Sequence, residues 1–439
     1  MDQESRIKYF ENLKKTSKPI SHMPIWYENH RQELAVYTID LEYLLYNQYN
    51  GRIASFVKSY EKQNGTRLDS SKKKDKVIIE KFLKNSNTGG NKKTKKSIEE
   101  QGQLKYGIVT KDGVIIDGNR RAMILNEIFD EKNENPRYFR GVILDKNLED
   151  NAKEIMRLET TYQMGEDAKV DYNAIEKYLK CQDLMKEGFT EDEIGKMMGE
   201  SETKVKDYIS IMNLMDDYLE QDQLGYDGIY TRLDKTEGAF VDLNSYLKRY
   251  KGGNSKMVQW NYDDTDINDL REIYFDYIRG IYNSKKPADS GDSKDYRYIG
   301  QSSKRGSFFI NEDIWTKFRE RHFEGIDKIN NEESTIDEIR EKHPNGSLDT
   351  LLKGRDEAWA SKSDSLLKNN LGRSKSDLDN KNNRDRPLDL LLSAKDKLES
   401  INTSSRSFLE DENVYQIVDE LRKLSDTYKN VIKNHLKNS

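Results

Sequence analysis

The sequence is poor in the residues that cross-link proteins or bind metal ions. Its 439 residues include one cysteine, Cys181, and five histidines that are scattered singly along the chain. A single cysteine excludes an internal disulfide, and scattered histidines argue against a zinc cluster. No apolar run approaches the roughly 20 residues that a membrane helix needs, and the first residues lack the apolar segment of a signal peptide. We therefore expect a cytoplasmic protein without membrane contact.

Proline and apolar residues are also scarce. The chain has 6 prolines, 34% hydrophobic residues and 35% charged residues. The long charged stretches have helical spacing, and this composition predicts a folded, mostly helical chain with a lean core and a highly charged surface. A chain of this length suggests two to four domains. The net charge of −5 does not by itself indicate a nucleic-acid binder.

The most informative stretch runs from Ser97 to Ile128. Asp112-Gly113 lies between two short apolar runs and is the strongest hairpin signal in the chain. Asp117-Gly118-Asn119 then ends the second strand, and the residues from Arg120 onward have helical spacing. The stretch therefore predicts a β-hairpin, a glycine turn and a helix, in that order.

The start of this helix predicts an anion site. A strand that ends on a glycine turn and leads into a helix presents unpaired backbone N–H groups and the positive end of the helix dipole. Arg120 and Arg121 occupy the first helical turn, where cations are unfavourable beside that dipole. A bound phosphate would remove the conflict. The alternative is an exposed arginine pair on an ordinary turn.

Two sequence blocks resemble the ParB/sulfiredoxin superfamily. Residues 97–121, SIEEQGQLKYGIVTKDGVIIDGNRR, resemble the nucleotide-binding block of ParB partition proteins, in which a glycine–arginine turn is commonly written GERR. Residues 158–163, LETTYQ, resemble the LENxQR segment of the same proteins. An Asn-rich segment that ends at Arg52 also resembles the N-x-R loop near the nucleotide. The chain departs from the family pattern at Asn119, Thr160 and Gln163, where Glu, Asn and Arg are usual.

This resemblance implies an α+β fold with a small mixed-sheet ParB/sulfiredoxin-like N-terminal domain, then an all-α helix-turn-helix domain and a largely helical C-terminal half. It also implies a bound nucleotide triphosphate, CTP or ATP, with Mg²⁺. The positions that match the family's nucleotide-binding residues are Gln103, Gly118, Asn119, Arg120, Arg121 and Thr160. By the same resemblance Glu159 would lie beside the metal ion and the triphosphate.

Two alternatives to a ParB-like DNA-binding protein stay open. Residues 117–121, DGNRR, resemble the DGQ-R or DGH-R turns of enzymes in the superfamily as closely as they resemble GERR. In such an NTPase or kinase-like enzyme, Asp117 or Glu159 would hold Mg²⁺ or orient water, and the arginines would stabilise the leaving phosphate. The other alternative is a non-catalytic adaptor that has lost nucleotide specificity, since Gln163 cannot replace the phosphate contact of an arginine.

Residues 190–209 have the spacing of a helix-turn-helix. Thr190 with Glu193 predicts a capping box, Gly199 lies at the turn, and Ser201 caps the second helix. The residues in place to contact DNA are Thr203, Lys204, Lys206 and Ser210. An acidic excess over residues 171–220 opposes DNA binding, so a protein-docking or purely structural helix pair is the alternative.

A lysine-rich insertion at about 60–96 precedes the glycine turn. Residues 51–100 hold 14 Lys/Arg and 6 Asp/Glu, a local charge of +8. We expect a mobile loop there, with four lysines placed to contact nucleic-acid backbone: Lys92, Lys93, Lys95 and Lys96. The alternative is a solvated loop without a partner.

The expected organisation follows from these blocks. The predicted regions are an N-terminal arm (1–30), the nucleotide-binding domain (31–150), the helix-turn-helix domain (151–220), a helical domain (221–345), a linker (346–386) and a C-terminal helical hairpin (387–439). An apolar stripe that includes Val414, Ile417 and Leu421 suits the packing of that hairpin or a homodimer contact. The predicted setting is plasmid segregation, transcription control or anti-phage defence in a prokaryote, with the protein on the nucleoid when it is bound to DNA.

Overall fold

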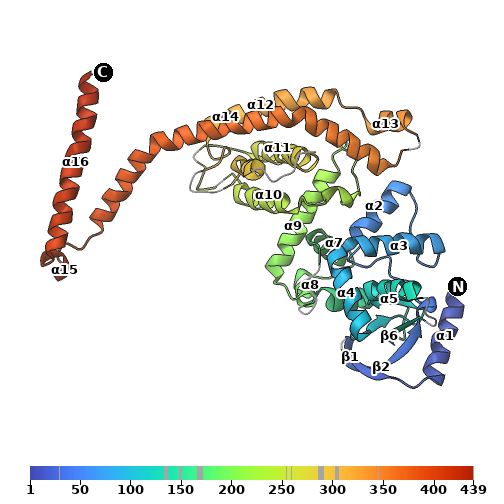
Figure 1. Cartoon of the computed structure of the whole chain (residues 1–439). Coiled ribbons are helices and arrows are strands. Elements are labelled where there is room, and N and C mark those ends of the chain that lie inside the picture. The colour runs from blue at the N-terminus through green and yellow to red at the C-terminus, as the bar shows by residue number, and fades with distance from the viewer. Residues whose placement is uncertain are drawn as a thin grey trace. The chain divides into compact units, whose positions relative to one another are not determined.

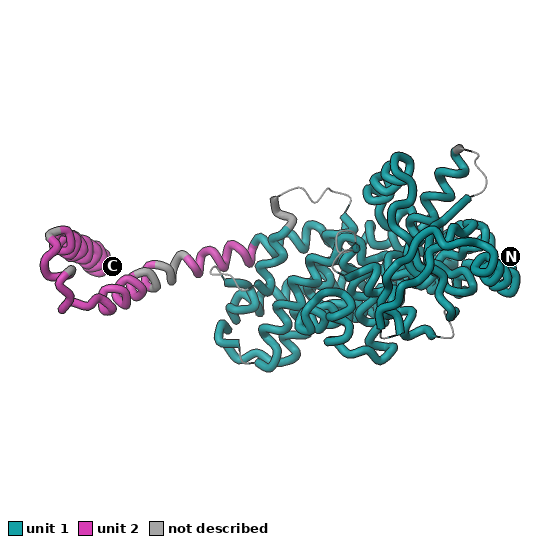
Figure 2. Tube along the Cα trace, turned by 90° about the horizontal axis from the view of Figure 1, so that it is seen from below, with its two compact units in different colours: residues 1–372 teal, residues 373–439 magenta. Residues whose placement is uncertain are grey.

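The chain folds into two compact units, residues 1–372 and 373–439, which Figure 2 shows in different colours. The computed structural model describes residues 1–28, 30–132, 137–147, 151–165, 172–253, 255–258, 260–284, 291–301, 306–344 and 346–438. None of the helices within these ranges is long and apolar enough to cross a membrane.

The first unit begins with a six-stranded mixed sheet in the order β1-β2-β6-β4-β5-β3. The strands are β1 (Ser21–Tyr27), β2 (His30–Asp40), β3 (Leu45–Tyr46), β4 (Gly107–Val109), β5 (Val114–Asp117) and β6 (Tyr138–Ile143). The β1–β2, β2–β6 and β4–β5 pairs are antiparallel, whereas β4–β6 and β3–β5 are parallel. A small mixed sheet followed by helices confirms the predicted α+β class (Figure 1).

Helices account for most of the remaining chain. Those up to residue 219 are α1 (Gln3–Thr16), η1 (Leu41–Tyr43), α2 (Ala54–Asn64), α3 (Lys73–Ser86), α4 (Thr88–Gln101), α5 (Asn119–Lys132), α6 (Ala152–Met164), α7 (Ala174–Lys186), α8 (Glu191–Met198) and α9 (Glu202–Leu219). The later ones are η3 (Tyr230–Leu233), α10 (Glu237–Tyr250), α11 (Asp264–Tyr282), η4 (Gly291–Ile299), α12 (Glu312–Asn331), α13 (Ile336–Lys342), α14 (Leu348–Glu399), α15 (Arg406–Leu409) and α16 (Glu412–Asn438).

The β4–β5 hairpin forms at Asp112-Gly113, as the sequence predicts. Gly113 has φ +92°, and a Cβ atom there would lie 2.4 Å from the backbone oxygen of Tyr43. Only glycine fits such a backbone with such a neighbour. Gly113 therefore allows the hairpin to turn tightly and also allows the Leu41–Tyr43 helix η1 to pack against it.

The first 30 residues are part of the domain. The predicted N-terminal arm consists mainly of helix α1 and the edge strand β1. Alternation along β1 buries Tyr27 at 4% exposure but leaves Trp26 58% exposed. Tyr27 therefore anchors this segment, whereas Trp26 does not.

The lysine-rich insertion is helical, which corrects the expectation of a mobile loop. Ile79 and Leu83 of α3 are buried in the core beneath the sheet. Asn87 then caps α4 by accepting a hydrogen bond from the N–H of Gly90 at 2.6 Å. The amide of Asn91 donates to the carbonyls of Leu83 and Lys84 at the end of α3. These asparagines join the two helices.

The helix pair α8–α9 has the caps that the sequence predicts. Thr190 and Glu193 form a capping box, and Ser201 caps α9 by accepting from Lys204 N. Gly199 adopts the left-handed conformation at the end of α8. A Cβ atom at Gly195 would lie 2.7 Å from the carbonyl oxygen of Glu200, so the two helices approach closely at this glycine.

Residues 346–386 are not a linker, because α14 begins at Leu348 and runs as one helix to Glu399. Trp359, Ser363 and Leu367 follow one another at helical spacing and are buried. The amide of Asn370 donates to the carbonyl of Phe318 in α12 at 2.9 Å. The small polar residues that suggested a linker thus include ones at packed positions. After α14 the chain breaks at residues 400–405, close to the predicted interruption at Ser404-Ser405.

Candidate functional site

The predicted glycine turn joins β5 to α5. β5 ends at Asp117, Gly118 follows with φ +107°, and α5 starts at Asn119. A Cβ atom at Gly118 would lie 2.8 Å from the ring of Phe139 in the central strand β6. The turn is therefore tightly packed against the sheet, and it holds the N-terminus of α5 at the sheet edge.

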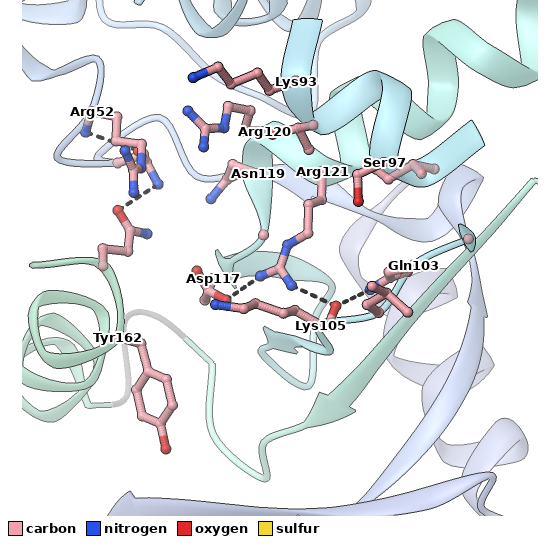
Figure 3. A pocket seen from close by; sticks show the side chains of 17 residues that line it. Arg52, Lys93, Ser97, Gln103, Lys105, Asp117, Asn119, Arg120, Arg121 and Tyr162 are labelled. Carbon is pink, nitrogen blue, oxygen red and sulfur yellow. Dashed lines mark hydrogen bonds and ion pairs between the residues drawn. The ribbon is translucent and has the colours of Figure 1, made fainter. Parts of the chain in front are cut away.

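A cavity of about 520 Å³ lies at this turn. Its walls come from the Asn50–Arg52 loop, α4, the segment after α4, the turn itself and α6. Five cationic side chains line it against one carboxylate, that of Asp117. The cations are Arg52, Lys93, Lys105, Arg120 and Arg121, and Figure 3 shows them around the turn. An excess of four positive charges beside a helix N-terminus suits an anion with several charges.

Arg121 is held in place by the protein. Its guanidinium pairs with Asp117 and donates to the carbonyls of Lys105 and Tyr106 at 2.6 and 3.1 Å. These contacts tie the turn to the segment that follows α4 (Figure 3). Arg121 therefore shapes the cavity as well as contributing charge to it.

Asn119 has a structural role that explains its difference from the family pattern. Its side-chain oxygen accepts from the N–H of Asn47 at 2.9 Å, and its NH₂ group donates to the carbonyl of Ile115 at 2.8 Å. A glutamate carboxylate could accept but could not donate. Asparagine at this position thus fits the buried turn because it can do both.

Gln103 also lines the cavity and is fully engaged. Its amide donates to the carbonyls of Lys105 and Arg140, and its oxygen accepts from the N–H of Arg140 at 2.7 Å. It joins the segment after α4 to strand β6. Gln103 therefore supports the wall of the cavity.

Glu159 and Thr160 do not reach the cavity. Glu159 is 4% exposed, pairs with Lys180 of α7 at 2.8 Å and accepts from the N–H of Gly51 at 3.2 Å. The hydroxyl of Thr160 is turned back to the carbonyl of Met156 within α6. The expectation that these two residues contact nucleotide or metal is not supported by their positions. The ion pair with Lys180 was not predicted, because its partner lies on another helix 21 residues away.

Gln163 fixes the opposite wall. Its NH₂ group donates to the carbonyl of Ile116 at 2.7 Å, and its oxygen accepts from Asn50 and from the hydroxyl of Tyr172. Tyr172 also lies beneath Arg52, whose guanidinium carbon is 4.5 Å from the ring centroid. Where the family has an arginine, this chain has a glutamine that positions the loop carrying Arg52.

A buried carboxylate fastens the same loop from α7. Glu176 accepts from the hydroxyl of Ser55 at 2.5 Å and from its N–H at 3.2 Å. It therefore caps the first turn of α2, whose own N-cap residue Ile53 makes no side-chain cap. Burial raises the pKa of Glu176 to about 7, although the hydrogen bonds from Ser55 oppose the shift.

The two carboxylates predicted to hold Mg²⁺ both have cationic partners. No group of three or more His, Cys, Asp or Glu side chains within the described ranges is placed to hold a metal ion. The carboxylate of Asp117 is paired with Arg121, and that of Glu159 is paired with Lys180. Mg²⁺ is usually held by one or two carboxylates together with substrate phosphates, so the metal role predicted for Asp117 and Glu159 would require each carboxylate to leave its ion pair.

The predicted DNA contacts on α9 divide into two sets. Thr203, Lys204 and Lys206 are exposed on its first two turns, although Lys206 pairs with Glu202. Ser210 faces the neighbouring helix instead, because its hydroxyl donates to Asn244 of α10 at 2.7 Å. Ser210 is thus not placed to contact DNA.

The four predicted lysines of α4 lie on different faces of the helix. Lys93 lines the cavity. Lys95 pairs with Glu127 and Glu131 of α5 at 3.3 and 2.6 Å. Lys92 and Lys96 are exposed, with a long contact of 3.8 Å between Lys96 and Glu100. Because α4 is a helix, successive lysines point in different directions, so these four do not share one surface.

Comparison with known proteins adds little to this geometry. No protein-family model matches the chain, and no curated protein matches it. Among solved structures, a Pnob8-like ParB-N domain matches with 14% identity and a TM-score of 0.28, over 66% of this chain and 97% of that one. At this TM-score the likeness carries no argument about ligands or partners. The ParB resemblance therefore depends on the sequence blocks, together with an α+β fold of the expected class.

Proposed function

We propose that the chain is a ParB-like protein that binds a nucleoside triphosphate at the turn of residues 117–121 and binds DNA through its helical regions. The observation that carries this proposal is the cavity at the N-terminus of α5, with five cations and one carboxylate. Phosphate chains are the anions that such a site favours, because backbone N–H groups, the helix dipole and cations all act together. The biological setting would be segregation, transcription control or anti-phage defence.

The cavity also offers a place for a base. Tyr162 and Ile98 line it from two different helices, α6 and α4. Figure 3 shows the Tyr162 ring apart from the cluster of arginines. We place the phosphates at the Gly118 turn and the base toward these apolar side chains, which supply stacking area but few groups to distinguish one base from another.

Binding rather than hydrolysis is the activity that the site supports. The two carboxylates proposed for catalysis are both held in ion pairs. A general base or metal ligand needs a carboxylate that can reach water or the metal ion. We therefore propose that the nucleotide acts as a bound effector.

Calorimetry with a panel of nucleoside triphosphates tests the site. Lys93→Glu and Lys105→Glu each reverse a charge in the cavity, and each should weaken binding by about 2–4 kcal/mol, as expected for loss of a charge-assisted phosphate contact. Lys96→Glu makes the same change on the exposed face of α4 outside the cavity and is the matched control. Equal affinity in all four proteins, including the parent, would refute the site assignment.

A further inference from the structure

A second cavity, of about 650 Å³, lies where the N-terminal region meets the later helices of the first unit. Its walls come from α2 and α3 on one side, and from η3, the end of α11 and the start of α14 on the other. It shares no lining residue with the cavity at the Gly118 turn. Its volume is within the range of small-molecule sites.

One wall of this cavity is aromatic. Phe56 and Phe82 stack with ring centroids 5.6 Å apart, and Tyr60 meets Phe82 edge-on at 6.0 Å. All three side chains are only half-buried and line the cavity. A half-exposed cluster of three rings is a suitable surface for a flat apolar or aromatic group.

The other walls carry mixed charge with a positive excess. The cations are Lys81, Arg232, Lys235 and Lys353, and the carboxylates are Asp234 and Asp349. Both carboxylates and all three lysines are exposed at the rim. Arg232 lies deeper, with a side chain that is 10% exposed.

Arg232 also belongs to a buried charge cluster with an excess of positive charge. Arg232, Arg279 and Arg355 share two carboxylates, Glu333 and Asp356. Arg279 lies 2.9 Å from Asp356, and the Arg355 contacts are longer, at 3.5 and 3.6 Å. In the ion pairs of this cluster three guanidinium groups face two carboxylates, and the exposed carboxylate of Asp349 at the rim also attracts Arg232.

One unsatisfied group of this cluster belongs to Arg232, the member of the cluster that lines the cavity. Within the part of the chain that the structure describes, the buried Nε–H group of Arg232 has no hydrogen-bond partner. Its Nη2 group is already engaged by Asp356 and by Asn283 at 3.3 Å. An anion in the cavity would both accept from Arg232 and balance the charge of the cluster.

We propose that this second cavity binds a small planar organic anion of the nucleoside monophosphate class. The ring lies against Phe56, Tyr60 and Phe82, and the anionic group faces Arg232 with the rim lysines around it. Because the two walls come from α2–α3 and from η3–α14, the ligand connects the N-terminal region to the later helices.

The test is calorimetry with AMP, UMP and inorganic phosphate on the full chain carrying Lys93→Glu and Lys105→Glu. These substitutions weaken the first site, so the remaining binding reports the second. We expect a monophosphate to bind with one site per chain, and to bind at least tenfold more tightly than inorganic phosphate because only it reaches the aromatic wall. Lys81→Glu and Lys353→Glu should each weaken binding about tenfold.

Lys74→Glu is the matched control, because Lys74 is an exposed lysine of the same helix as Lys81 and does not line the cavity. Hydrogen exchange should show protection of η3 and of the start of α14 when the monophosphate is added. The proposal is overturned if no monophosphate binds, if phosphate alone binds equally well, or if Lys74→Glu weakens binding as much as Lys81→Glu does.

Discussion

Single buried side chains hold the loop that carries Arg52. Gln163, Glu159 and Glu176 contact successive parts of that loop, at Asn50, Gly51 and Ser55. Each comes from α6 or α7, which lie outside the sheet. The position of one cavity wall therefore depends on buried polar contacts, and these are strong only when every partner is present.

Glu176 should make stability depend on pH. Its folded pKa of about 7 is above the ordinary glutamate value of 4.5, so between these values the folded state keeps a proton that the unfolded state has lost. Stability from this group is therefore fully present below about pH 4.5 and falls as pH rises to about 7, by an amount on the order of 3 kcal/mol. Urea unfolding between pH 5 and pH 8, roughly the range in which native stability is normally greatest, should show this fall.

Glu176→Gln should remove this pH dependence of the free energy of unfolding, because an amide can still accept from Ser55 but does not titrate. Glu187→Gln, an exposed change at the end of the same helix, should leave the profile unchanged. A parental pH dependence in Glu176→Gln would show that another group is responsible.

The Glu159–Lys180 pair should behave as a buried ion pair. Lys180→Met leaves the Glu159 carboxylate buried without its partner, and should lower the free energy of unfolding by about 3–5 kcal/mol. The double variant Glu159→Leu/Lys180→Met should recover much of this loss, because no charge stays buried. Denaturant unfolding measures both. Full stability in Lys180→Met would mean that Glu159 is hydrated and free for another role.

At the scale of residues, the sequence predicts the positions that depend on neighbouring residues in the chain, but not the contacts between distant segments. Gly118, Arg120 and Arg121 are identified by the order of strand, glycine and helix, and they do line one cavity. The partners of Glu159 and Gln163 depend on the packing of α6 against α7 and the Asn50 loop, which has no local pattern. Lys93 was assigned to DNA because its neighbours are lysines, whereas the helical rotation of α4 brings it into the cavity.

The candidate DNA contacts lie on two helices, α4 and α9. α9 presents Thr203 and Lys204, and α4 presents Lys92 and Lys96. Carboxylates are frequent around α8 and α9, so these helices alone supply little attraction for phosphate. The outward lysines of α4 can add backbone contacts that carry no sequence information.

Substituting the α4 lysines should change the salt dependence of DNA binding. Lys92→Ala with Lys96→Ala should reduce the slope of log K against log salt by about 0.9 for each lost phosphate contact, and should weaken all sequences alike. Lys95→Ala is the internal control, because Lys95 is engaged by α5 carboxylates. Thr203→Ala with Lys204→Ala should instead reduce discrimination between sites. Fluorescence anisotropy over a salt series distinguishes these results, and a parental slope without Lys92 and Lys96 would remove α4 from the interface.

At the scale of elements, composition misled where small polar residues lie in helices or at helix ends. The segments 85–91 and 360–386 have the Ser, Asn and Gly content of loops, yet both lie largely in helices. Asn87, Asn91 and Asn370 each make side-chain contacts to backbone groups across helix ends or between helices. Such contacts depend on a neighbour's position, so the same residues favour a loop when only their own sequence is considered.

The second unit presents an apolar seam along α16. Ile417, Leu421, Leu424, Tyr428 and Val431 recur at alternating steps of four and three residues, and all are exposed. This is the heptad spacing of a coiled coil. Of the two roles expected from the sequence, packing of a helical hairpin and a homodimer contact, we propose the homodimer contact for this seam.

Leu421→Glu with Leu424→Glu should therefore convert a dimer into a monomer, because two carboxylates would face their symmetry mates in an apolar seam. Light scattering coupled to size exclusion measures the mass. Lys433→Glu lies off the seam on the same helix and should leave the mass unchanged. A parental protein that is already monomeric at the highest concentration would contradict the dimer.

The order of strands has a consequence for how the chain folds. β6 is the last strand in sequence, yet it pairs with both β2 and β4 in the middle of the sheet. Without it, the β1–β2 hairpin and the β4-β5-β3 strands have no hydrogen-bonded connection. During synthesis, the sheet therefore cannot close before residue 143 has been made, and contacts of such sequence separation form slowly. A chain that stops before Tyr138 should remain unfolded, and the complete chain should form the cavity at the Gly118 turn late in folding.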